Sequence, residues 1–142
     1  MTVIKYYVIP GDPIALARVK YGRGKFYDSQ KHTKLLTGIY IRNHHEDARF
    51  FEGPVFMDII FHLPIPKGVQ DKERLMHQYH FFKPDTSNLL KFIEDVAESI
   101  CYHNDCIISK INVEKVYSVN PRTEFTLSEI VDRRLERKLC VV

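Results

Sequence analysis

The sequence predicts an α/β (α+β) protein, a single domain over residues 1–142 with a mixed sheet of about four strands and helices mainly on one face. The length is one reason, because 142 residues suffice for one domain with a buried core. The other reason is that two patterns alternate along the chain. Short segments rich in β-branched and aromatic residues are typical of strands, and apolar residues spaced three and four apart are typical of helices.

The N-terminal part predicts a strand and then a helix. The segment "TVIKYYVIP" is rich in strand-forming residues and ends at Pro10-Gly11, which predicts a strand followed by a turn. After a basic loop, residues 29–50 show helical spacing. The apolar side of this helix consists of Leu35, Leu36, Ile39, Tyr40 and Ala48.

The next segment, "VFMDIIFHLPIP", predicts a central strand over residues 55–66. By the two-residue period of a strand, Asp58 and His62 lie on the same face of it. Residues 67–83 have mixed charge and poor periodicity, so we expect a long connection with one helical turn. Long connections in compact domains are often functional.

The clearest predicted helix follows Pro84. Its apolar positions form one continuous stripe, and Thr86 or Ser87 is placed to cap its N-terminus. The stripe consists of Leu89, Phe92, Ile93, Val96, Ala97 and Ile100. Beyond a tight turn, "CIISKINVEKVYS" and "TEFTLSEI" predict two paired strands, and residues 131–142 predict a short amphipathic helix.

Basic residues are concentrated in one loop, although the net charge of the chain is only +3. The block consists of Arg18, Lys20, Arg23, Lys25, Lys31 and Lys34. Such a block is typical either of a solvated loop or of a surface that contacts nucleic-acid phosphates. Its aromatic residues Tyr21, Phe26 and Tyr27 either stack on bases or pin the loop to the core.

The sequence disfavours a membrane or secreted location and a structural zinc site. No apolar stretch approaches the length of a membrane span, and the first residues lack a signal-peptide pattern, so we expect a cytoplasmic protein. The spacing of Cys101, His103 and Cys106 matches no common structural zinc pattern. We therefore expect Cys101 to pack at the end of the preceding helix.

The helix after Pro84 lies between two carboxylates, Asp85 and Asp105. If the fold brings them together, they form with Ser87 and Lys91 a pocket of oxygen ligands suited to Mg²⁺, with Mn²⁺ as the alternative. Such an ion can activate water for attack on a phosphodiester. The structural alternative is a capped helix followed by a polar turn, in which Lys91 and Asp95 form an ordinary i,i+4 pair.

The segment "KPDTSNLLKFIEDVAESICYHNDCIISKINVEK" resembles the signature of the RusA-type Holliday-junction resolvases. That family has a Pro-Asp-x-Asp-Asn-x-x-Lys segment that opens a helix, an Asp one turn later, an aromatic-x-Asp-Asp turn, and a strand that ends in a lysine. The segments "YYVIPGDP" and "KFYDSQ" resemble the opening strand and basic loop of the family. The resemblance extends over about residues 3 to 130.

The resemblance implies roles for individual residues. Asp85 and Asp105 match catalytic, metal-binding aspartates, and Lys91 matches the catalytic lysine. Asn88 and Asp95 match neighbouring polar positions, for which we expect supporting roles. Two positions depart from the family pattern. Ser87 stands at the second catalytic aspartate, and Asn104 replaces the first acid of the following pair.

The resemblance implies a homodimeric, Mg²⁺-dependent, structure-selective endonuclease that resolves Holliday junctions and other branched DNA in recombination and repair. The basic residues between Arg18 and Lys34 would then hold DNA phosphates. Two alternatives stay open. One is a junction-binding protein that has lost cleavage together with its second aspartate. The other is a globular protein with no role on DNA.

Overall fold

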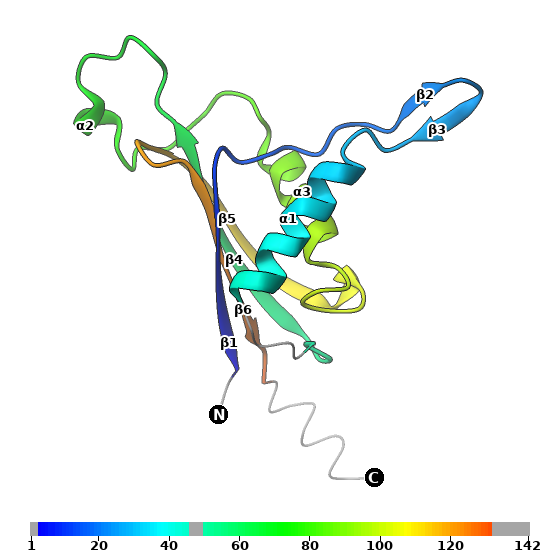
Figure 1. Ribbon diagram of the computed structural model, residues 1–142. Coiled ribbons are helices and arrows are strands. Elements are labelled where there is room, and N and C mark those ends of the chain that lie inside the picture. Colours follow the sequence, from blue (N-terminus) through cyan, green and yellow to red (C-terminus); the bar gives the residue numbers. More distant parts are fainter. Residues whose placement is uncertain (1–2, 46–49, 132–142) are drawn as a thin grey trace, which may run out of the picture.

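The computed structural model describes residues 3–45 and 50–131. Its main sheet has four strands, and Figure 1 shows the two long helices on one face of that sheet. The predicted fold class is thereby confirmed, whereas the helix predicted over residues 131–142 lies almost wholly outside the described residues. The sheet strands are β1 (Ile4–Pro10), β4 (Val55–Pro64), β5 (Ile108–Ser118) and β6 (Arg122–Glu129). The other elements are the hairpin strands β2 (Lys20–Gly22) and β3 (Lys25–Tyr27), the helices α1 (Lys31–His44), α2 (Lys72–Leu75) and α3 (Thr86–Ala97), and the 3₁₀ turn η1 (Asp105–Ile107).

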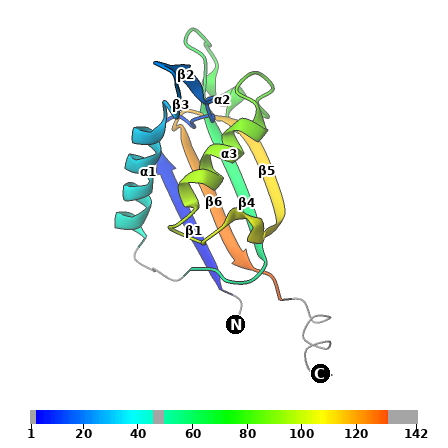
Figure 2. The same cartoon turned by 90° about the vertical axis from the view of Figure 1, so that its right-hand side faces the viewer.

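The strands of the large sheet lie in the order β1-β6-β4-β5. β6 is antiparallel to both β1 and β4, and β5 is parallel to β4. The prediction that the last two strands pair with each other was therefore wrong, because β4 lies between them. A parallel pair needs a long crossover connection, and the chain between β4 and β5, which includes α3, supplies it (Figure 2).

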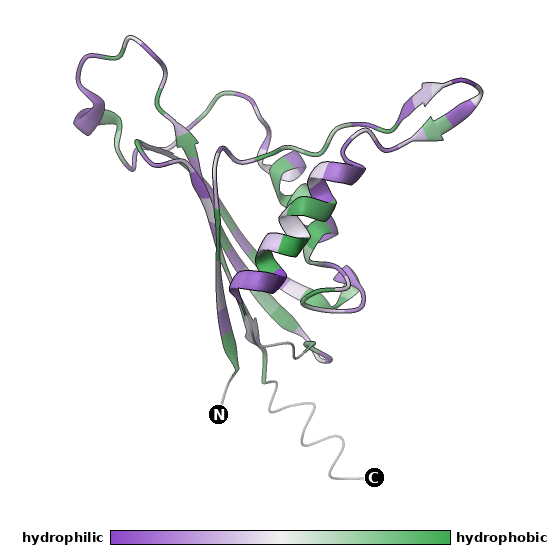
Figure 3. Ribbon diagram, in the orientation of Figure 1, coloured by the Kyte–Doolittle hydropathy of each residue, from purple (hydrophilic) through white to green (hydrophobic). Residues whose placement is uncertain are grey.

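The core lies between the sheet and the helices. Alternate residues of β4, from Val55 through Met57, Ile59 and Phe61, are fully buried. They pack in the same core cluster as Leu89 and the other buried residues of α3, which confirms the predicted apolar stripe (Figure 3). Cys101 belongs to this cluster, as predicted. The helix itself ends at Ala97, so Ile100 follows it in the next turn.

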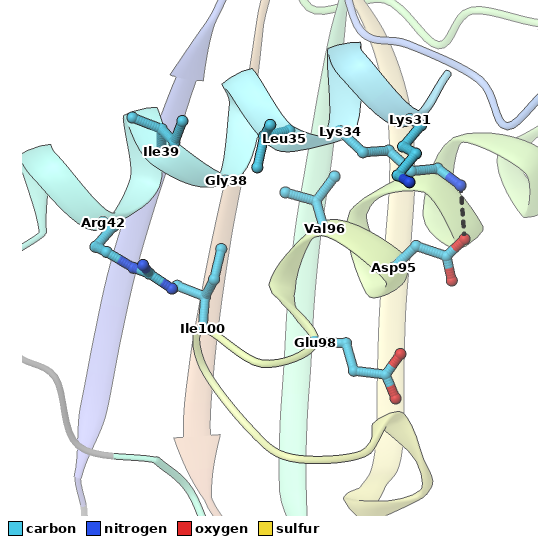
Figure 4. A pocket seen from close by; sticks show the side chains of 10 residues that line it. All are labelled: Lys31, Lys34, Leu35, Gly38, Ile39, Arg42, Asp95, Val96, Glu98 and Ile100. Atoms are coloured by element: carbon cyan, nitrogen blue, oxygen red, sulfur yellow. Dashed lines mark hydrogen bonds and ion pairs between the residues drawn. The ribbon is translucent and has the colours of Figure 1, made fainter. Parts of the chain in front are cut away.

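Helix α1 packs differently from its apolar pattern. Leu35, Leu36 and Ile39 are exposed, and the buried positions are Gly38 and Ile41. A Cβ atom on Gly38 would lie 2.9 Å from Cδ1 of Ile100, so α1 and the end of the α3 region approach closely at this point (Figure 4). The outward apolar side of α1 instead lines an open pocket with a volume of about 350 Å³.

The basic loop folds as the hairpin β2–β3, which projects from the body of the protein (Figure 1). Its two turn residues, Arg23 and Gly24, have φ angles of +52° and +76°, as a tight two-residue hairpin requires. Tyr21 and Phe26 are about two-thirds or more exposed, with ring centroids 5.0 Å apart. The aromatic residues therefore do not pin this loop to the core.

Candidate active site

Asp85 occupies the N-cap position of α3, where Thr86 or Ser87 was predicted. Its backbone is extended, and its carbonyl accepts the first helical hydrogen bond from Leu89 N at 3.1 Å. Its side chain makes no capping hydrogen bond to the helix. The carboxylate is thus exposed at the positive end of the helix dipole, with its oxygen atoms free of the first turn.

Ser87 and Lys91 lie one turn apart on the outward side of α3, and both are exposed. The expected order of the polar side chains along this helix is therefore present. Asn88 is half-buried, and its carbonyl accepts a hydrogen bond from Leu16 N at 2.9 Å. The residue expected to support the site thus attaches the segment after β1 to the first turn of α3.

Asp105 begins the 3₁₀ turn η1, and Asn104 is the cap of that turn. The Asn104 Oδ1 atom accepts a hydrogen bond from Cys106 N at 2.9 Å. Asp105 is half-buried and lies close enough to Glu94 to act on its ionisation. Burial raises the pKa of Glu94, the negative charge of Asp105 raises it further, and Lys91 opposes the rise.

Glu94 was missed in the sequence. It lies seven residues after Ser87 and three after Lys91, so all three share the outward side of α3. That helical spacing was the available signal. The charges of both Asp105 and Lys91 therefore act on the ionisation of Glu94.

Asp85 directly precedes the first residue of α3, and Asp105 begins η1, eight residues after the helix ends at Ala97. Ligation of one Mg²⁺ ion by both carboxylates stays a prediction. Among residues 3–45 and 50–131, no group of three or more His, Cys, Asp or Glu side chains is placed to hold a metal.

Lys34 is engaged within the protein. Its Nζ atom lies 2.8 Å from Asp28 Oδ2 and 3.3 Å from Asp95 Oδ2, so it connects the loop, α1 and α3. Figure 4 shows the contact with Asp95. Asp95 thus pairs with α1. Both contacts raise the pKa of Lys34 against the opposing effect of its burial, and the Lys34 ammonium lowers the pKa of Asp28.

The loop that leads to Asp85 is attached to β5. His80 N donates to Lys115 O at 3.0 Å, and the Lys115 ammonium donates to the carbonyls of Phe82 at 2.7 Å and Pro84 at 2.8 Å. Phe81 and Phe82 are exposed and stacked, with ring centroids 4.6 Å apart. In the sequence, Lys115 stands out only as the end of the motif, because its contacts lie more than 30 residues away along the chain.

The motif on α3 and its flanking turns is matched by a protein-family model. The model of endodeoxyribonuclease RusA aligns with residues 10–128, which is most of the chain. The chain belongs to the RusA endodeoxyribonuclease family. The predicted relationship is thus confirmed. The chain is also 27% identical over 142 residues to the uncharacterized protein YqaN of Bacillus subtilis (strain 168), covering 92% of this chain and 99% of that one.

Membership of this family implies a nuclease that acts on branched DNA, and nucleases of this family are generally dependent on divalent metals. Within the described part of the chain, no helix is long and apolar enough to cross a membrane.

Proposed function

We propose that this RusA-family protein binds four-way and other branched DNA junctions and cleaves them with the help of Mg²⁺ or Mn²⁺, in recombination and repair. The observation that supports the proposal most directly is the exposed outward side of α3. It presents Asp85, Ser87 and Lys91 in the order of the family motif, on a chain that the family model matches over residues 10–128.

The residues have distinct proposed roles. Asp85 and the hydroxyl of Ser87 offer oxygen atoms for Mg²⁺, an ion that is commonly held by one or two carboxylates together with substrate phosphate. When bound, such an ion supplies charge stabilisation at the phosphate and an activated water. Lys91 would neutralise charge on the phosphate. Asp105 is the proposed second carboxylate of the metal site.

The projecting hairpin is the proposed phosphate-binding surface. Lys20, Arg23 and Lys25 are exposed on it, Arg18 is exposed just before it, and Lys31 is exposed at the start of α1. Lys34 belongs to the same sequence block, but its charge is compensated by Asp28 and Asp95. We therefore leave Lys34 out of the proposed DNA surface.

A homodimer is the proposed active form. A four-way junction has approximate two-fold symmetry, and a symmetric dimer presents one site to each of two strands. Sedimentation equilibrium with and without junction DNA would measure the assembly directly. A monomer in both conditions would contradict the proposal.

Cleavage of a synthetic four-way junction tests the main proposal. We expect Mg²⁺-dependent nicking that Asp85→Asn and Asp105→Asn abolish, while both variants still retard the junction in a gel. Asp71→Asn is the matched control. Asp71 caps α2 through Arg74 N, and Asn caps a helix about as well as Asp, so cleavage should be unchanged. Equal cleavage by the wild type and Asp85→Asn would refute the proposed site.

Junction binding without cleavage is the second candidate. One observation favours it: Ser87 supplies no charge at the position of the family's second aspartate. Tight, junction-selective binding with no nicking in either Mg²⁺ or Mn²⁺ would establish this function. Equal affinity for junction and linear duplex would exclude both candidates.

A further inference from the structure

Lys115 is a charged residue on the helix-covered face of the sheet for which the proposed mechanism has no role. It pairs with Phe61 of β4, whose side chain is fully buried in the core. Its own side chain is half-buried. A lysine in such a place usually extends its charged end to water. The ammonium of Lys115 instead donates two hydrogen bonds to main-chain carbonyls of one loop.

That loop is held along β5 by its backbone as well. His77 N donates to Tyr117 O, Tyr117 N donates to Gln78 O, and His80 N donates to Lys115 O, each at 3.0 Å. The loop thus runs beside the end of β5 as far as His80. Beyond that residue, the Lys115 ammonium attaches the loop to β5 through hydrogen bonds to the carbonyls of Phe82 and Pro84.

The contact with Pro84 bears directly on Asp85. A peptide unit is planar, so the carbonyl of Pro84 lies in one plane with the nitrogen and Cα of Asp85. Lys115 holds that carbonyl at 2.8 Å. On the other side, the carbonyl of Asp85 is held by Leu89 N. Both peptide units that flank Asp85 therefore have a hydrogen-bonded carbonyl, which restricts the backbone on either side of its side chain.

We propose that Lys115 is a positioning residue for the candidate active site: its ammonium holds the Pro84 carbonyl and thereby sets the direction in which the Asp85 carboxylate leaves the backbone. The inference deepens the proposed function and rests on it for its effect on cleavage. The positioning itself can be measured without cleavage. Partners that orient a ligand residue commonly change metal affinity or activity 10- to 100-fold when removed.

Three variants test the proposal. Lys115→Met keeps the aliphatic stem and removes the donors, whereas Lys115→Arg keeps donors and charge. Lys110→Met is the matched control. Lys110 is also on β5, but its ammonium lies over the Phe56 ring, 5.0 Å from the centroid. Lys110→Met therefore removes one lysine of β5 without changing a contact to the loop before Asp85.

The first readout is amide hydrogen exchange of residues 81–90. Lys115→Met should speed exchange around Asp85 at least tenfold, Lys115→Arg should restore most of the protection, and Lys110→Met should leave it unchanged. Unaltered exchange in Lys115→Met would overturn the proposal, whether or not the protein cleaves DNA. If Lys115→Met does not fold, the wild type still provides a test of the contact between Lys115 and the loop. The Lys115 ammonium protons should exchange with water more slowly than those of Lys110, and equal rates would refute the contact.

The second readout separates positioning from binding. For junction cleavage, Lys115→Met should lower kcat by about 10- to 100-fold and leave the junction Kd in the absence of metal within about twofold of the wild type. A lysine that only contacts DNA would change Kd and leave kcat intact, and that result would overturn the assignment. A wild type that never cleaves would refute the proposed nuclease, while the exchange experiment would still decide the role of Lys115.

Discussion

Removing the charges of the β2–β3 hairpin should flatten the salt dependence of junction binding. The informative variant combines Lys20→Gln, Arg23→Asn and Lys25→Gln. Asn is chosen at Arg23 because this residue has a φ of +52°, a conformation that Asn tolerates better than most residues. All three side chains are exposed on a hairpin that projects from the body, so the variant should fold as the wild type does.

The magnitude follows from counterion release. Each phosphate contact adds about 0.9 to the slope of log K against log salt, so three lost contacts lower the slope by about 2.7. Between about 50 and 200 mM salt, the affinity of the variant should then fall about 40-fold less than that of the wild type. Fluorescence anisotropy with a labelled four-way junction, in the absence of Mg²⁺, measures both slopes.

Lys34→Gln is the matched control for this experiment. Lys34 belongs to the same basic block, but its ammonium contacts Asp28 and Asp95. Its replacement should change the slope by less than one contact. A slope that stays the same in the hairpin variant would mean that the hairpin is only a solvated surface. A full unit lost in Lys34→Gln alone would refute the distinction between free and compensated charges.

Three further predictions concern metal, packing and pH. Ser87→Asp should raise junction cleavage and Mn²⁺ affinity at least tenfold. Because an acid suits the first turn of α3, the unfolding free energy should change by under about 0.5 kcal/mol. A folded variant with neither gain would show that the missing charge is not limiting. Leu89→Ala, at a fully buried position, should cost about 2–5 kcal/mol in urea unfolding, and a loss below about 1 kcal/mol would contradict its place in the core. Burial, and secondarily Arg122, lowers the pKa of His62, so the imidazole binds a proton more readily in the unfolded chain. The unfolding free energy should therefore fall as the pH drops below about 6.5. His62→Gln should show a smaller fall, and equal falls in the variant and the wild type would refute the role of His62.

Local patterns in the sequence determined the elements that depend on one segment alone. The alternation of Val55, Met57, Ile59 and Phe61 predicts a strand with one buried face, and the structure has it. The apolar stripe of α3 likewise predicts its buried side. With the stripe buried, the helical period alone puts Ser87 and Lys91 on the outward side. Such statements need only the geometry of one helix or strand, which is why they could be made from the residues.

Contacts between distant segments were decided by the tertiary structure. The alternating residues of β5 and β6 are typical of strands. This alternation does not indicate which strand lies next to which in the sheet, and β4 lies between the two. The apolar side of α1 is exposed because the close approach of α1 to Ile100 occurs at Gly38, the one position there without a side chain. Local spacing measures amphipathicity, and the packing partner decides which side is covered.

The candidate site shows the same division. The motif has Asp85, Lys91 and Asp105 in the family's order, but how far apart they lie depends on the length of α3 and on where the chain turns into β5. The hold of Lys115 on the Pro84 carbonyl joins residues 31 positions apart. Every residue has a main-chain carbonyl, so the sequence does not indicate which carbonyl the lysine binds. Only the folded chain, by bringing the end of β5 against the loop before α3, gives this lysine its partner.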